Sequence, residues 1–174
     1  MPRDSRSDGR STFDGRTRPL DAVNLRLLSE LQDNPRLSMS ELARRVGMSA
    51  PAVTERVQRL EAAGVIVGYR IDIDPAALGL PVTALVRIRP GPGQLPKITL
   101  AAQETAQVVE CHRITGEDCF LLKIHAPSIG ELEEILDLFL LYGQTTSSIV
   151  VSTPVPARSL PLPTATTAPV DTGA

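Results

Sequence analysis

The chain has 174 residues, of which 42% are hydrophobic and 22% are charged, and its net charge is −2. This balance is ordinary for a globular protein and leaves room for one domain or two small ones. No apolar run reaches the ~18 residues that a membrane span needs, and the N-terminus lacks the apolar core of a secretory signal. We therefore expect a cytoplasmic protein with no membrane partner. Its two cysteines, Cys111 and Cys119, are too few for a disulfide scaffold or a four-ligand zinc site, so we expect no metal and no cofactor.

Charge is distributed unevenly along the chain. The net charge is +2 over residues 1–19, zero over residues 20–65 and −4 over residues 66–153. An acidic C-terminal half would be repelled by DNA phosphates, so any contact with DNA should come from the N-terminal half. The two ends differ from the rest in composition. Residues 1–18 hold few large apolar side chains and predict a disordered arm, whereas residues 154–174 predict an extended Pro/Thr/Ala-rich tail.

Residues 19–66 have the pattern of three short helices. The first runs over residues 21–31, where apolar side chains recur at helical spacing, and stops near Asn34-Pro35. Ser38 and Glu41 have the spacing of a capping box at the start of a second helix. Gly47 ends that helix in a turn that favours positive φ.

The third helix of this segment predicts the DNA-binding surface. Ser49 can cap it, Gly64 ends it, and its buried stripe is Val53, Val57 and Leu60. Three helices with a tight glycine turn match a helix-turn-helix, whose last helix enters the major groove of double-stranded DNA. We expect the outer side chains of this helix, its first turn and two arginines of the preceding helix to contact bases or phosphates. These candidate DNA-binding residues are Arg44, Arg45, Ser49, Ala50, Pro51, Thr54, Glu55, Arg56, Gln58 and Arg59.

The rest of the chain predicts a linker and a second domain. Val65 to Asp74 is β-like, so residues 67–80 are expected to form a linker strand, or small wing, and a loop. Residues 81–153 alternate between strand and helix patterns in the order of a ferredoxin-like βαββαβ fold, with Gly116 in the central hairpin. The expected strands are Val82–Arg89, Val108–Thr115, Cys119–Ala126 and Thr146–Ser152, and the expected helices are Leu95–Glu104 and a segment from Ser128 to about Tyr142.

An ordered series of sequence blocks gives the chain a likeness to one family. Over residues 20–153 it resembles the Lrp/AsnC, or feast/famine, regulators. The blocks are Leu42-Ala43-Arg44-Arg45-Val46-Gly47-Met48-Ser49, Arg56-Val57 with Arg59-Leu60-Glu61, Gly64-Val65-Ile66, Glu110-Cys111-His112 and Leu121-Leu122-Lys123. The resemblance implies an α+β protein with a winged helix-turn-helix followed by a ferredoxin-like effector domain. It also implies a homodimer or a higher even-numbered oligomer and, in many members, an amino acid bound between subunits.

The resemblance also indicates where an effector would bind. The loop after the second strand of the effector domain contains Gly116, Glu117, Asp118 and Cys119, and a polar run at Thr145, Thr146 and Ser147 occupies a second position that often faces the ligand. Family members often have an aspartate where this chain has Cys119. A carboxylate at Glu117 or Asp118 could still hold a ligand ammonium.

Two other functions compete with a DNA-binding regulator. Some relatives of the family decarboxylate sirohaem-type tetrapyrroles with histidines, but His112 and His125 have no metal-ligand or catalytic spacing around them. The second alternative is an effector-binding assembly protein whose DNA-binding domain is vestigial. The intact helix-turn-helix spacing favours the regulator, which we expect not to be an enzyme.

We expect His112 to be a half-buried strand residue and both cysteines to be buried. A hairpin at Thr115–Asp118 would keep the cysteines from facing each other.

An assembly is also expected from the shape of the effector domain. Its helices should cover only one face of the sheet, and an uncovered apolar face usually marks an interface. We expect Val82, Leu85, Val86, Ile149 and Val151 to contribute to that uncovered surface.

Overall fold

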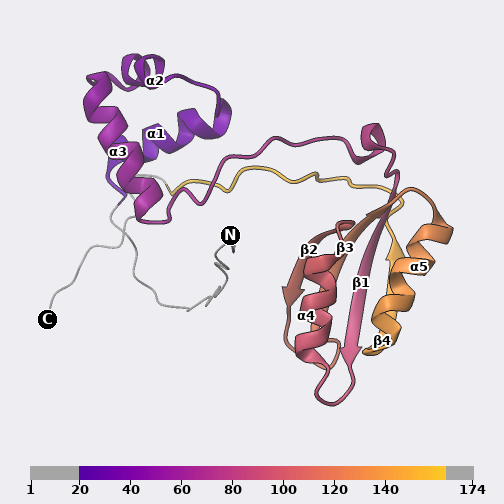
Figure 1. Cartoon of the computed structure of the whole chain (residues 1–174). Helices are drawn as coiled ribbons and strands as arrows, with labels where there is room; N and C mark the ends of the chain where they lie inside the picture. Colours follow the sequence, from indigo (N-terminus) through magenta and orange to yellow (C-terminus); the bar gives the residue numbers. More distant parts are fainter. Residues whose placement is uncertain (1–19, 164–174) are drawn as a thin grey trace, which may run out of the picture. The chain divides into compact units, whose positions relative to one another are not determined.

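The computed structural model describes residues 20–163 and divides into two compact units (Figure 1). The first unit holds residues up to Arg70 together with the described end of the chain from Arg158, and the second holds Ile71–Ala157. The expected arm (residues 1–18) and the last part of the expected tail (residues 164–174) lie outside the described residues. Within the described range, no helix is both long enough and apolar enough to cross a bilayer.

The first unit consists of the helices α1 (Ala22–Asp33), α2 (Met39–Val46) and α3 (Ala50–Ala62). Asp21 caps α1 by accepting a hydrogen bond from the Asn24 backbone N–H at 2.7 Å. Ser38 caps α2 by accepting one from the Glu41 N–H at 3.2 Å. This bond is one half of the expected capping box. The other half would use the Glu41 carboxylate, which pairs with Arg44 and Arg45 instead.

A glycine turn and a small apolar core hold these helices together. Gly47 ends α2 with φ of 73°, which confirms the expected left-handed turn between α2 and α3. The core side chains come from all three helices, so each helix buries one stripe and leaves the opposite side exposed. The buried members are Leu27, Leu31, Leu42, Ala43, Val46, Val53 and Val57.

The segment after α3 differs from the expectation. No strand is described in Val65–Asp74, so the predicted linker strand or wing strand does not form within the described residues of the single chain. Apolar side chains there lie in solvent, with Val67 95% and Ile71 80% exposed. A strand requires a hydrogen-bonded neighbour, which an isolated extended segment does not have. A short 3₁₀ helix, η1 (Pro75–Leu78), follows, and Asp74 caps it.

The second unit has the expected ferredoxin-like order of elements. They are β1 (Val82–Pro90), α4 (Leu95–Glu104), β2 (Val108–Arg113), β3 (Phe120–Ala126), α5 (Ile129–Leu140) and β4 (Gly143–Ile149). The strands form one antiparallel sheet in the order β2-β3-β1-β4. Figure 1 shows α4 and α5 on the same side of this sheet.

Both helices pack on one face of the sheet, and the other face is open. The covered face includes Ala84, Val86 and Ile88 of β1, which are fully buried, whereas Leu85 between them is 41% exposed. The expectation that Val82 and Val86 belong to the open face is therefore wrong by one residue of strand alternation, since Val82 also packs against the core under the helices. Val151 lies beyond the end of β4 rather than on the sheet. The open face also carries charged side chains and is less apolar than we expected.

The last strand begins three residues earlier than expected, and Gly143 explains why. A Cβ built at Gly143 would lie 2.2 Å from the backbone oxygen of Arg89, so only glycine fits there. It allows the chain to leave α5 at Leu140 and pair with the end of β1 almost at once, with Gly143 opposite Pro90. In a sequence, a glycine at this position is read as the end of an element. A glycine within a strand can also mark a place where another backbone approaches closely.

The described part of the C-terminal tail has neither helix nor strand, as expected for its composition. It is not wholly free of contacts, since Gln32 Nε2 donates a hydrogen bond to the Leu160 carbonyl at 3.2 Å and Leu162 is half-buried. The described part of the tail around Leu160 therefore contacts α1 within the first unit.

Candidate functional site

One side of α3 forms an exposed polar surface. Val53, Val57 and Leu60 are buried beneath the helix. Four side chains on the opposite side are exposed, and these are Pro51, Glu55, Gln58 and Arg59. Thr54 and Arg56 lie on the two flanks and are half-buried. The exposure that we expected from a rotation of 100° per residue is therefore found, although exposure alone does not identify a DNA contact.

The start of α3 leaves backbone donors open. Ser49 occupies the N-cap position, but its side chain makes no capping hydrogen bond. Ala50 packs partly against the core, and Pro51 has no N–H to satisfy. The first turn of a helix carries unpaired N–H groups and partial positive charge, so this end of α3 suits a phosphate. Thr54 is less available, because its hydroxyl donates to the Ala50 carbonyl at 2.9 Å.

The arginines of α2 are paired with glutamates. Glu41 accepts from Arg44 Nη2 at 2.6 Å and from Arg45 Nε at 3.0 Å, and Arg45 Nη1 also reaches Glu30 at 2.9 Å. The hydrogen bonds from Arg44 and Arg45 lower the pKa of Glu41 from its usual 4.5 to about 2. Glu30 and Glu41 in turn raise the pKa of Arg45. Exposed pairs of this kind are weak in water, so a DNA phosphate could compete for either arginine.

The two arginines of α3 are held in different ways. Arg59 pairs with Glu55 one turn earlier on the same helix, and its side chain is 75% exposed. Arg56 reaches a different helix, where Nη1 lies 2.7 Å from Asp21 Oδ2 and 3.1 Å from Asn24 Oδ1. The sequence did not identify Asp21 or Asn24 as partners, because nothing in local spacing reveals a contact made over more than thirty residues.

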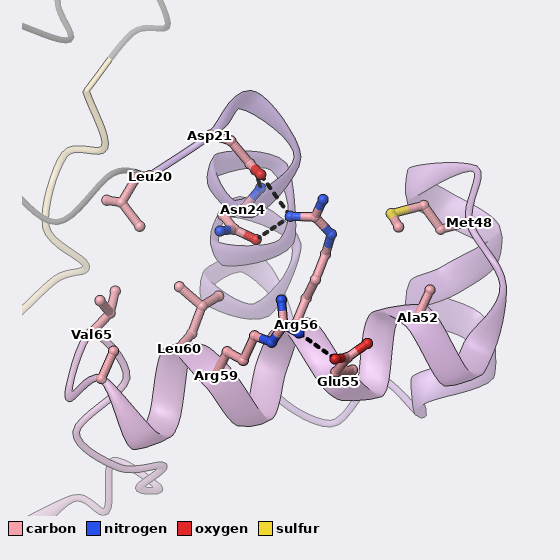
Figure 2. Close-up of a pocket in the computed structure, with 11 residues that line it drawn as sticks. Leu20, Asp21, Asn24, Met48, Ala52, Glu55, Arg56, Arg59, Leu60 and Val65 are labelled. Carbon is pink, nitrogen blue, oxygen red and sulfur yellow. Dashed lines mark hydrogen bonds and ion pairs between the residues drawn. The ribbon is translucent and has the colours of Figure 1, made fainter.

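These α3 arginines border a pocket in the first unit. It has a volume of about 660 Å³ and lies between the start of α1 and one flank of α3 (Figure 2). Its lining combines aliphatic side chains with two arginines and two acids. The lining residues are Leu20, Asp21, Asn24, Met48, Ala52, Glu55, Arg56, Arg59, Leu60, Ala63 and Val65.

In the second unit, one arginine pairs with both acids of the candidate effector loop and offsets part of their charge. Gly116 turns the β2–β3 hairpin with φ of 105°, as expected. Arg89 at the end of β1 bridges both acids of the loop, with Nη2 at 2.8 Å from Glu117 Oε2 and Nε at 3.1 Å from Asp118 Oδ1. Sequence reasoning missed Arg89. Its signal was the alternation of β1, which puts Arg87 and Arg89 on the face opposite the buried side chains.

The polar run of β4 is divided between the two faces of the sheet. Thr146 pairs with Arg87 and lies on the open face, whereas Thr145 and Ser147 pair with the buried Ile88 and Val86. Cys119 packs against the core beneath the helices. A single chain therefore brings Glu117, Asp118 and Thr146 to the face that holds Arg89, and it leaves the other candidate effector residues elsewhere.

The remaining titratable candidates are separate from one another. His125 is buried, and its Nδ1 lies 2.9 Å from the Thr83 hydroxyl. His112 is exposed on the edge strand β2 and lies 3.4 Å from Glu110, so the half-buried position that we expected is wrong. Cys111 is exposed on the same strand, which corrects the expectation of a buried thiol. An edge strand is covered on fewer sides than a central one. Cys111 faces Leu122 rather than Cys119, as expected from the hairpin.

Comparison with known proteins matches both units to families. Residues 20–67 match the winged helix-turn-helix DNA-binding family, and residues 83–160 match the Lrp/AsnC ligand-binding domain. The chain is 35% identical over 133 residues to the HTH-type transcriptional regulator LrpC of Bacillus subtilis, which covers 76% of this chain and 92% of that protein. The chain belongs to the Lrp/AsnC family.

Other relatives of this Lrp/AsnC protein agree. The leucine-responsive regulatory protein of Haemophilus influenzae is 36% identical over 129 residues, covering 72% of this chain and 78% of the relative. The structure of Bacillus subtilis LrpC aligns with a TM-score of 0.74 at 34% identity, covering 78% of this chain and 97% of that one. A feast or famine regulatory protein from M. tuberculosis, complexed with L-methionine, aligns with a TM-score of 0.76 at 33% identity, covering 82% and 99%. All of these relatives are named as regulators.

Proposed function

We propose that this Lrp/AsnC protein is a sequence-specific transcriptional regulator that reads double-stranded DNA with the exposed face of α3. One observation carries the proposal. Pro51, Glu55, Gln58 and Arg59 lie in solvent on a helix whose opposite side is buried in the core. A helix anchored on one side and polar on the other is what reading the major groove requires.

The proposal gives these residues different roles. Gln58 is the side chain best suited to a base edge, because it is exposed and carries both a donor and an acceptor. Arg44 and Arg59 would contact phosphates after exchanging their glutamate partners for DNA. Arg45 would exchange only Glu41 and keep its pair with Glu30 of α1. Ser49 and Ala50 would bring the first turn of α3 to a phosphate.

Sequencing the DNA fragments that co-purify with the protein tests this function. We expect a recurring short site among the fragments, at a salt concentration where non-specific binding is weak. Even coverage of the genome at every salt concentration would contradict sequence-specific recognition.

We further propose that the second unit binds a small effector, such as an amino acid, between two subunits. Three observations support this: the match to a ligand-binding domain, the loop with two carboxylates beside Gly116, and solved relatives in complex with L-methionine. A ligand ammonium would have to displace Arg89 from Glu117 and Asp118. Thr146 would line the same face, whereas Thr145, Ser147 and Cys119 belong to the other face of the sheet in a single chain.

A thermal-shift screen with the common amino acids tests the effector site. A true ligand at 100 times its dissociation constant should stabilise the protein by roughly 2.7 kcal/mol. Asp118→Asn and Glu117→Gln should reduce that shift, whereas the control Glu133→Gln, on the exposed side of α5, should keep it. A ligand that binds all three variants as well as the parent would place the site elsewhere.

A further inference from the structure

Arg56 connects the recognition helix α3 to the start of α1. Its side chain is only 31% exposed, and its Nη1 lies within hydrogen-bond distance of both Asp21 and Asn24. Asp21 uses its two oxygens for different tasks, since Oδ1 caps α1 through the Asn24 N–H and Oδ2 accepts from Arg56. The Asn24 N–H and the Arg56 guanidinium together hold the pKa of Asp21 below its usual value. Asp21 is therefore ionised and ready to pair at neutral pH.

We propose that Arg56 is a positioning residue rather than a phosphate contact, and that its contacts with Asp21 and Asn24 hold α3 in the orientation that DNA binding requires. The inference rests on the proposed use of α3 in reading DNA. It replaces the direct role that the sequence pattern suggested for Arg56.

The pocket beside Arg56 explains why such a contact is needed. Apolar packing does not fill the space between the start of α1 and this flank of α3, where about 660 Å³ is open. Figure 2 shows the Arg56 side chain extending from α3 across this space to Asp21 and Asn24. A guanidinium presents several donors in a fixed plane, so it can fix the relative orientation of two helices as well as their distance.

Charge also argues against a phosphate at Arg56. A phosphate close enough to bond this guanidinium would approach the Asp21 carboxylate, and the like charges would repel each other. Arg59 also pairs with a carboxylate, but that pair does not join two helices. Its partner Glu55 lies one turn away on the same helix, so exchanging Glu55 for a phosphate would not disturb the packing of α3. Arg59 is therefore the matched control.

The test compares Arg56→Gln, Asp21→Asn, their double variant and Arg59→Gln in the full-length protein. Asparagine keeps an oxygen that can cap α1, so Asp21→Asn removes mainly the ionic partner of Arg56. Two properties are measured for each protein. One is the midpoint of thermal unfolding without DNA. The other is the affinity for a fluorescent mixed-sequence duplex over a range of salt concentrations, at a temperature where every variant is folded.

We expect Arg56→Gln and Asp21→Asn each to lower the midpoint by about 2–4 °C, and the double variant to lower it no further. Both single variants should weaken DNA binding by a similar factor while the slope of log K against log salt stays at the wild-type value. Arg59→Gln should lower the magnitude of that slope by about 0.9, the value for one lost phosphate contact.

Three results would overturn the inference. The first is a slope that falls by about 0.9 in Arg56→Gln, which marks a phosphate contact. The second is stronger DNA binding by Asp21→Asn, which means that Asp21 withholds Arg56 from DNA. The third is a lower midpoint with unchanged affinity, which means that the contact serves stability alone. Failure of the wild-type protein to bind the duplex would instead overturn the proposed function together with this inference.

Discussion

The partners of each arginine in the first unit determine what that arginine can do for DNA. Arg44 and Arg59 are each 75% exposed, and their partners Glu41 and Glu55 lie on the same helix, so these pairs can open without moving α2 or α3. Arg56 pairs with a residue of another helix, and opening that pair removes a contact between helices. The net charge of residues 20–65 is zero, so it does not show which arginines are available to DNA.

A buried histidine should make the second unit sensitive to pH. Burial lowers the pKa of His125 below its usual 6.5, and the nearby Lys123 adds to this effect. Below pH 6.5 the unfolded chain binds a proton that folded His125 does not bind, so stability falls as pH decreases towards the lowered pKa. Above pH 6.5 this residue contributes no pH dependence.

Urea unfolding between about pH 8 and about pH 5 measures this effect. Replacing His125 with glutamine should reduce the pH dependence in this window, by at most about 1.4 kcal/mol per pH unit for one proton. His112→Gln, at an exposed position on β2, controls for the loss of a histidine. An unchanged slope in His125→Gln would show that another group is responsible.

Two glycines, one at the start of β4 and one in α5, should respond in opposite ways to substitution by alanine. Gly143 starts β4 where a Cβ would lie 2.2 Å from the Arg89 backbone oxygen, so Gly143→Ala should destabilise the protein by about 1–3 kcal/mol. Gly130 is the control, since its Cβ would meet only the Ser128 hydroxyl at 3.9 Å. Gly130→Ala should instead stabilise α5 by up to about 1 kcal/mol. Chemical denaturation distinguishes the two, and equal stability of both variants would contradict the close approach at Gly143.

Elements with a strong local pattern could be predicted from the sequence. The span Leu95–Glu104 of α4, the left-handed turn at Gly47 and the facing of Cys111 and Leu122 were all expected and are confirmed. Two failures have one cause, which is that pairing between distant segments leaves little trace in local sequence. Val65–Asp74 has β-like residues but no strand partner among residues 20–163, and β4 begins at a glycine that only the proximity of Arg89 explains.

The candidate sites were predictable to different degrees. Exposure on α3 follows from helical periodicity, and so the polar face could be identified. The ion pairs Arg56–Asp21 and Arg89–Asp118 could not be identified, because they join residues that only the tertiary fold brings together. The split of Thr145, Thr146 and Ser147 between two faces depends on strand register, which the sequence leaves uncertain by one residue.

At the scale of the whole molecule, we predict a dimer or a higher even-numbered assembly. Helices cover one face of the sheet, and Leu85 on the other face is 41% exposed. Val67 and Ile71 lie in solvent in a segment that pairs with no strand among the described residues. Exposed apolar groups and unpaired backbone of this kind are usually covered in an assembly.

Light scattering at micromolar concentration measures the assembly directly. We expect a mass of at least twice that of the 18.7-kDa chain. Val67→Lys with Ile71→Lys should shift the equilibrium towards monomer, whereas Leu138→Lys, on the outer side of α5, serves as the control for added charge. A monomeric wild-type protein would contradict the prediction.

In the proposed mode of binding, a symmetric assembly reads DNA with the exposed face of α3. Selection of binding sites from a random duplex library, carried out in parallel with the wild-type protein and Gln58→Ala, tests it most directly. We expect a two-fold symmetric site with half-site centres separated by about 10 base pairs or a multiple of that spacing. We also expect Gln58→Ala to lose about 1–3 kcal/mol of preference at the same position in both half-sites. Failure to enrich any site would contradict this mode of binding. So would an unchanged site in Gln58→Ala and in single variants of the other exposed α3 residues.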